Sequence, residues 1–477
     1  MFSKIYRSVT VLLVIFLFGS IGFAQNENDA IRVGFPGLGS NARALGMGNS
    51  FISLSNDASA SFYNPAGFGL IDKMEFSGGL DYLKFSNESE FFNTSTDYSN
   101  SSTNLNRVSF AFPIPTVRGS LVFGLSYHKT KDFTGAVKFD GFNSGSHSKI
   151  QSLLDSGIPF DLYLTDTLNQ TPINGLLNQS GTILRSGSID NWTLSAAIEV
   201  AKNLFIGANL NIISGNFKYD SDYYEDDTQN IYQGETADGE PQTTDFRTFY
   251  LKNILDWNIA GWNAKLGLIY KLNPYVNFGA TIQFPKTFNI KEDFTVDGFS
   301  EFGTGTMYNL DTDFYSDKVE YDILTPFEFA AGFAIDYAGL IFAAEGTLID
   351  YSQMEFGNAA GLSAQYISDI NKRILELLRT SVNYNIGLEY IIPVLSMKLR
   401  AGYFLQQSPY KDDPSEFDRK YLTAGIGFTA QNAIGIDFAY AHGWWSDFGD
   451  NYGVNQSRFF QDITTDLVSF TITYHFN

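Results

Sequence analysis

The sequence predicts an all-β protein: a transmembrane antiparallel β-barrel of about 14 strands with an N-terminal hatch, or plug, segment. Three observations support this fold class. Apolar and polar residues alternate in almost every stretch that could be a strand, short and long connections alternate between these stretches, and no run long enough for a spanning helix follows residue 24. In Leu467–Phe476, every second residue from Val468 onward is apolar. In an outer-membrane barrel such a face meets lipid, and the polar face meets the lumen.

The first 24 residues have the pattern of a secretory signal peptide. Lys4 and Arg7 provide the charged region, and Val9–Phe18 is an apolar run shorter than the roughly 20 residues that a spanning helix needs. Gly22–Ala24 resembles a small-residue cleavage site, so we expect the mature chain to begin at Gln25. An uncleaved anchor is the alternative.

Two regions follow the signal peptide. Residues 25–72 are rich in Gly, Ala, Ser and Asn and show little alternation, which fits a plug segment as well as an ordinary N-terminal extension, and residues 73–477 form the predicted barrel. The predicted spanning strands have close to the roughly 9–11 residues that a tilted strand requires. They are Phe76–Phe85, Arg107–Pro113, Leu121–His128, Trp192–Val200, Leu204–Ile213, Gly261–Tyr270, Val276–Phe284, Glu328–Asp336, Leu340–Ile349, Tyr384–Ile392, Met397–Leu405, Leu422–Ala430, Ile434–His442 and Leu467–Phe476.

The connections predict the orientation of the barrel. Tight turns such as 201–203 and 337–339 alternate with long connections such as 129–191 and 214–260. Bacterial barrels place short turns in the periplasm and long loops outside. With an even number of strands, we therefore expect both termini in the periplasm and the protein in the outer membrane of a Gram-negative bacterium, surrounded by its lipid.

Composition argues against most other functions. The net charge is −21, and nucleic-acid binding requires basic patches, so we expect no nucleic-acid partner. The chain has no cysteine, which rules out disulfides and thiolate chemistry. Its four histidines have no metal-ligand spacing, and no Ser/His/Asp arrangement stands out. We therefore expect no catalytic residue, no metal and no cofactor.

Two of the long connections contain apolar residues that a solvated loop does not need. In Ile367–Leu378 these residues fall near helical spacing. One interpretation is that both loops pack onto the rim of the barrel; the other is that they first capture a hydrophobic ligand. The other such stretch is Lys149–Leu177, and its candidate capture residues are Leu153, Leu154, Ile158, Phe160, Leu162 and Leu164.

The plug segment carries a resemblance to a known family. Within Gly37–Leu70, the pattern ALGMGNSF followed by NDASASFYNPAG resembles the N-terminal hatch of the FadL/TodX outer-membrane transporters of hydrophobic compounds, whose hatch motif matches Asn64-Pro65-Ala66. Ser186–Val200 and Gly261–Pro285 are similar to strand regions of the same family. The family usually ends on an aromatic residue, which the barrel-assembly machinery recognises as a partner; here Asn477 follows Phe476.

This resemblance implies passive uptake of hydrophobic small molecules such as long-chain fatty acids or aromatic hydrocarbons. The ligand would bind the outer loops, enter the lumen and leave sideways when the hatch (Asn64, Pro65, Ala66) shifts. In the family the exit lies beside a kinked third strand, which here would be Ser120–His128, with Gly124 as the expected weak point. The alternative is a PorV-like accessory barrel that binds partner proteins in secretion, since such barrels share the NPAG-type sequence.

Overall fold

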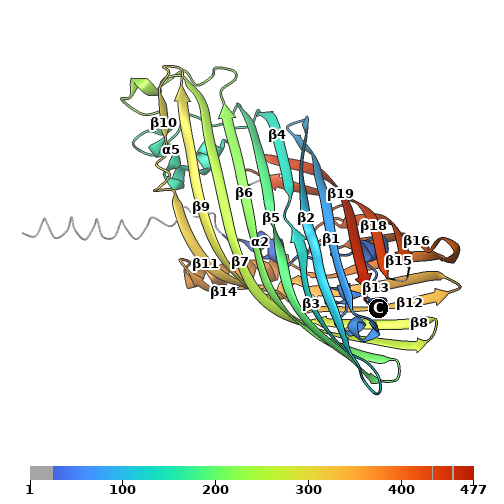
Figure 1. Ribbon diagram of the computed structural model, residues 1–477. Coiled ribbons are helices and arrows are strands. Elements are labelled where there is room, and N and C mark those ends of the chain that lie inside the picture. The colour runs from blue at the N-terminus through green and yellow to red at the C-terminus, as the bar shows by residue number, and fades with distance from the viewer. Residues whose placement is uncertain (1–24, 432, 454–455, 477) are drawn as a thin grey trace, which may run out of the picture.

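The computed structural model describes residues 25–431, 433–453 and 456–476. The predicted signal peptide lies outside these residues. Nineteen antiparallel strands are hydrogen-bonded into one sheet, and fourteen of them close into a barrel (Figure 1). The closure is made by the first and last strands, which pair from Glu75 opposite His475 to Glu90 opposite Phe460. Closure leaves no free sheet edge in lipid, where an unpaired backbone group costs several kcal/mol.

The fourteen barrel strands confirm the predicted strand count. Each contains the core of one predicted spanning segment, in the predicted order. They are β1 (Glu75–Phe91), β2 (Thr94–Ile114), β3 (Leu121–Asp132), β5 (Leu177–Ala201), β6 (Leu204–Asp226), β7 (Phe246–Asn273), β8 (Val276–Gln283), β12 (Glu328–Tyr337), β13 (Leu340–Asp350), β15 (Thr380–Ile392), β16 (Met397–Gln406), β17 (Arg419–Ala430), β18 (Ile434–Asp450) and β19 (Arg458–His475).

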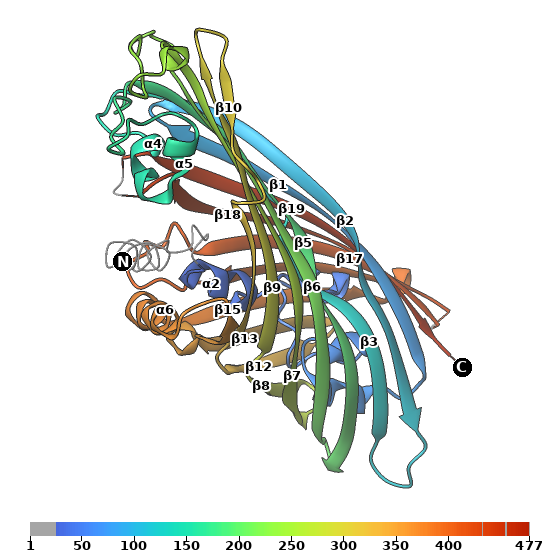
Figure 2. The same ribbon diagram turned by 90° about the vertical axis from the view of Figure 1, so that its left-hand side faces the viewer.

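Several strands are much longer than the membrane requires. β5, β6 and β7 have 25, 23 and 28 residues, against the roughly 9–11 that span a bilayer. They continue past the predicted segments into the long connections, and their extended parts form the upper wall of the barrel (Figure 2). Five further strands complete this upper wall: β4 (Gly135–Asn143), β9 (Thr287–Phe302), β10 (Met307–Asn309), β11 (Ser316–Leu324) and β14 (Glu355–Ala360).

The outer face of the barrel carries an apolar belt, meaning the outward-facing apolar side chains of the fourteen strands. Trp192 and Trp262 are 53% and 58% exposed, and Tyr270 also faces outward, as the alternation predicts. Farther up the same strands the outward residues become charged, and Lys218 pairs with Asp256 at 3.0 Å across β6 and β7. The belt therefore ends just above Trp262. Among the described residues, no helix has the length and apolar character needed to cross a membrane.

The long connections fold into two hydrophobic clusters above the belt. One surrounds α4 (Lys149–Ser152), η3 (Leu154–Ser156) and α5 (Ile158–Asp161), with η4 (Pro241–Thr243) in a neighbouring connection. The other joins α6 (Ala364–Leu377) to the upper wall through the buried side chains of Ile370 and Ile374. The connections are therefore packed structures that raise and narrow the mouth of the barrel.

Tryptophan fluorescence tests which face of the wall meets lipid. In variants that retain a single tryptophan, brominated lipid should quench Trp192 and Trp262, because both project from the apolar belt. Trp257, five residues before Trp262 in β7 and fully buried inside the wall, is the matched control and should keep its fluorescence. Quenching of Trp257 in preference to Trp262 would contradict the register.

Candidate functional site

The plug segment, residues 25–72, lies inside the barrel. Its helical turns are α2 (Glu27–Gly34), α3 (Ala42–Gly46), η1 (Ala58–Ser61) and η2 (Pro65–Leu70). Short polar side chains start each turn, as Asn41 does for α3 and Asn64 for η2, by accepting a hydrogen bond from the backbone two residues on. Small residues and frequent caps let the chain turn sharply in a narrow lumen.

The Asn64-Pro65-Ala66 triplet sits directly against the wall. The Asn64 side-chain amide donates to the Leu268 carbonyl of β7 at 3.0 Å and to the Ile52 carbonyl of the plug at 2.9 Å. Two wall glycines make this approach possible. A Cβ at Gly267 would lie 2.0 Å from Asn64 Oδ1, and a Cβ at Gly207 would lie 2.4 Å from the Pro65 carbonyl carbon. These contacts bring the plug backbone against the strands.

Buried charges hold the plug to the opposite side of the wall. Arg43 of α3 lies 3.4 Å from the Glu389 carboxylate of β15, which also accepts from Arg400 of β16 at 2.6 Å. Arg400 in turn contacts Asp437 of β18 at 2.7 Å. Because breaking a buried ion pair leaves an uncompensated charge, such pairs resist removal of one partner. The network thus couples the position of the plug to three wall strands.

A second carboxylate of the wall binds the plug backbone. Glu345 of β13 accepts from the amides of Phe51 and Ile52, both at 2.9 Å. On β7, the Lys265 ammonium donates to the Phe62 carbonyl at 2.7 Å. Charges that the alternation places on the lumen face therefore serve as anchors for the plug.

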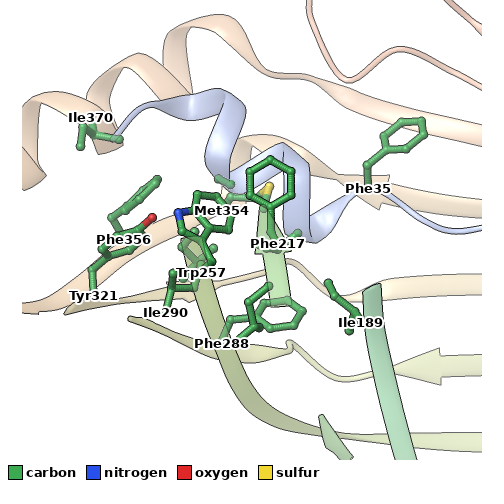
Figure 3. Close-up of a cluster of buried hydrophobic side chains, with 14 of the residues drawn as sticks. Phe35, Ile189, Phe217, Trp257, Phe288, Ile290, Tyr321, Met354, Phe356 and Ile370 are labelled. Atoms are coloured by element: carbon green, nitrogen blue, oxygen red, sulfur yellow. The ribbon is translucent and has the colours of Figure 1, made fainter. Parts of the chain in front are cut away.

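The beginning of the plug reaches above the apolar belt. There Glu292 of β9 is buried and accepts hydrogen bonds from the side chains of Gln25, Trp257 and Tyr321 at 2.8, 2.9 and 2.8 Å. Burial raises the pKa of Glu292 to about 7, and the nearby Asp29 carboxylate adds to this rise. Figure 3 shows the apolar side chains that enclose this region. The environment therefore favours a protonated Glu292.

Two of the cavities between the plug and the wall adjoin the same part of the plug. The first has a volume of about 180 Å³ and the second about 320 Å³, and the stretch Phe35–Gly39 borders both. The first combines aromatic rings with the charged side chains of Lys265, Glu328 and Glu345. The second is lined by aromatic rings and cations. Together they form a lumen in which an apolar molecule meets polar groups at several points.

Cations stacked on aromatic rings define the second cavity. The Arg419 guanidinium lies 4.5 Å from the ring centroid of Phe35 and 4.8 Å from that of Trp445. Arg32 lies 4.6 Å from the ring of Phe217 in the same way. Such cation–π contacts keep charged groups in an apolar site at low cost. The cavity therefore suits a molecule with an apolar body and a polar end.

The strand ladder shows no interruption at Gly124, the expected weak point of the third strand. β3 pairs without interruption with β2 and with β5 on either side of Gly124, and the register shifts only between Lys129 and Lys131. Gly124 instead makes room for the plug, since a Cβ there would lie 2.3 Å from the ring of Phe68. Its role is close packing, which a strand pattern does not distinguish from a bulge.

The candidate capture residues lie mostly in the upper cluster around α4 and α5. Ile158, Leu162 and Leu164 are buried there, and Leu153 packs against the same cluster. Phe160 is 53% exposed. The geometry favours the packing interpretation for the buried residues and leaves Phe160 as an exposed apolar group of this loop.

Sequence reasoning did not find the residues that line the second cavity. Arg32, Phe217, Arg419 and Trp445 come from the plug and three separate strands. Their stacking depends on long-range closure of the barrel, which no local spacing records. The only local signal was weak: Arg419 begins β17 and Arg32 lies in the plug, each as a single arginine in its element.

These features define a class: a fourteen-stranded transmembrane β-barrel whose lumen is filled by its own N-terminal segment. No protein-family model matches the sequence, and no curated protein is significantly similar to it. Solved structures do match. The P. putida toluene transporter TodX is 14% identical with a TM-score of 0.58, over 92% of this chain and 99% of TodX.

Two further solved structures share the arrangement. A Pseudomonas aeruginosa FadL homologue is 14% identical with a TM-score of 0.56, over 93% of this chain and 100% of that one. The CymD monoaromatic hydrocarbon channel is 15% identical with a TM-score of 0.53, over 92% and 98%. The chain therefore has the fold of the FadL and TodX barrels.

Enlarging a wall glycine should displace the plug. Gly267→Ala places a methyl group where Asn64 now lies, so we expect a several-fold rise in ion conductance across planar bilayers. Gly346→Ala is the control, because its Cβ would meet nothing nearer than the Asn383 carbonyl at 3.8 Å. Equal conductance of the two variants would show that the plug does not depend on the close contact.

The start of the plug should loosen as pH rises. Glu292 has a folded pKa above its ordinary value of 4.5, so its stabilisation is complete below that value and is lost as pH rises through about 7. At about 1.4 kcal/mol per pKa unit the loss is a few kcal/mol. Hydrogen exchange of residues 25–35, corrected for intrinsic rate, should be faster at pH 8 than at pH 5.

Glu292→Gln should reduce that dependence, and the part that remains belongs to Asp29, whose pKa is also raised by burial. Glu320→Gln, which changes an exposed acid of the neighbouring strand β11, should leave the dependence intact. An undiminished pH effect in Glu292→Gln would assign it to another group.

Proposed function

We propose that this protein is an outer-membrane channel for the passive uptake of hydrophobic small molecules such as long-chain fatty acids or aromatic hydrocarbons. The observation that carries the proposal is the pair of cavities between the plug and the wall, both of them lined in part by aromatic rings. The solved structures that share the fold include a toluene transporter and a monoaromatic hydrocarbon channel. They are transport proteins, which agrees with a non-enzymatic role here.

The plug leaves separate cavities in the lumen rather than an open pore. A solute enters between the upper clusters and reaches the second cavity, where Phe35, Trp445 and Tyr421 offer apolar surface. Burial in such a site favours binding by about 0.8 kcal/mol per CH₂ group. The stretch Phe35–Gly39 separates this cavity from the first, so movement of the plug connects them.

The polar groups in the lumen give the plug its role as a hatch. The contacts of Asn64, Arg43 and the amides of Phe51 and Ile52 are hydrogen bonds and ion pairs to the wall. Apolar contacts of Phe51 and Phe68 with the wall accompany them. A shift of the plug therefore exchanges both kinds of contact, while the strand pairing that closes the barrel stays intact.

Mass spectrometry of organic extracts tests the proposal. We expect the mildly solubilised protein to carry a fatty acid or hydrocarbon that is absent from a general porin purified in the same way. Replacement of Phe35 and Trp445 by alanine should reduce the amount bound several-fold, because both rings line the second cavity. Phe448→Ala, a ring farther along β18 that does not line either cavity, is the control. A clean extract, with a protein partner retained through purification, would instead support a secretion accessory.

A further inference from the structure

Two neighbouring strands of the wall are interrupted opposite each other. Residues 284–286 separate β8 from β9, and residues 325–327 separate β11 from β12. Each tripeptide contains a proline, Pro285 or Pro326, which has no N–H to donate to a ladder. We call the two facing tripeptides the proline break. In the next strand, η5 (Tyr351–Gln353) interrupts the wall between β13 and β14 at the same height.

Few interactions hold the proline break closed. The Lys286 amide donates to the Thr325 side-chain oxygen at 2.9 Å, and the Thr325 amide donates to the Lys286 carbonyl at 3.0 Å. The Lys286 ammonium pairs with the Glu328 carboxylate at 2.7 Å, and Gln283 donates to the same carboxylate. Most of these contacts involve side chains, which can rotate away without unravelling a strand.

The first cavity lies directly behind the proline break. Gln283, Lys286 and Glu328 all line it. The end of α2 covers the neighbouring wall: a Cβ at Gly34 would lie 2.5 Å from Met354 and 3.7 Å from Thr325. A shift of the plug therefore removes support from the interrupted strands.

The outer side of the proline break faces lipid. Phe284, Phe327 and Phe329 are exposed. The ring centroid of Phe327 lies 5.6 Å from that of Phe284 and 6.0 Å from that of Phe329. Just above them, outward charges begin with the pairs Lys291–Glu320 and Lys318–Asp293. The break therefore lies at the upper edge of the apolar belt, where aromatic rings favour the membrane interface.

We propose that the proline break is the place where an apolar solute passes from the first cavity sideways into the outer leaflet. This inference rests on the proposed function and gives it a route that differs from the wall around Gly124. At Gly124 the ladders on both sides are continuous. Separating these strands would leave backbone N–H and C=O groups without partners in lipid. At the proline break, part of the hydrogen-bond ladder is already missing. Rotation of Lys286 and Glu328 opens a path between phenylalanine rings.

Engineered disulfides test the route, because the chain has no cysteine of its own. Thr287→Cys with Leu324→Cys joins two directly paired residues just above the break. The control joins Phe112→Cys with Phe123→Cys across β2 and β3, beside Gly124. Paired antiparallel residues lie within disulfide range. The assay is uptake of radiolabelled oleate by cells that depend on this protein, before and after reduction.

We expect oxidised Thr287→Cys/Leu324→Cys to lose most uptake and to regain it on reduction, while the control keeps the parental rate. Recovery on reduction shows that the variant is folded. Parental uptake through the oxidised break would overturn the inference, as would loss of uptake in the oxidised control alone. Either result would leave the proposed function standing, since the parent still transports. A parent that takes up no oleate or toluene would overturn both.

Discussion

The rest of the structure depends on one constraint, the pairing of every backbone group that faces lipid. Fourteen strands meet it by closing β1 onto β19. Closure determines which side chains point outward and which point into the lumen. It also makes an interruption in the wall informative, because a gap in the ladder must be compensated by side chains or covered by packed chain.

The plug segment supplies that packing from the inside. It approaches the wall at glycines, where backbones come close, and at charges, where Arg43 and Glu345 join plug and barrel. Close packing and polar contacts play different parts. The glycine contacts bring the plug backbone against the strands, and the buried ion pairs hold it at that position. A lumen filled in this way keeps solutes from passing freely yet retains cavities of molecular size.

The spanning strands could be predicted from sequence because lipid imposes a period of two on each of them. Trp262 and Tyr270 face outward for that reason, and all fourteen segments were recognisable. The upper wall could not be predicted in the same way. Water surrounds the outer face of β9 and β11. Their sequences therefore alternate buried and charged residues, and such a sequence is hard to distinguish from that of a solvated loop.

The contacts of the candidate site are harder to anticipate than the strands. Gly124 illustrates the difficulty: a glycine in a strand signals either a kink or a close neighbour, and here the neighbour is Phe68, some 50 residues away in sequence. The stacking of Arg419 on Phe35 and Trp445 likewise joins three distant segments. Pro285 and Pro326 are visible in the sequence, but their opposition becomes apparent only once the strands are paired.

The length of β7 has a consequence for the height of the barrel wall. Fifteen of its residues, 246–260, precede the predicted spanning segment, and at about 3.3 Å per residue they extend roughly 50 Å along the strand. The wall on this side therefore rises well past the apolar belt, and the lumen continues beyond the part of the barrel that lipid surrounds.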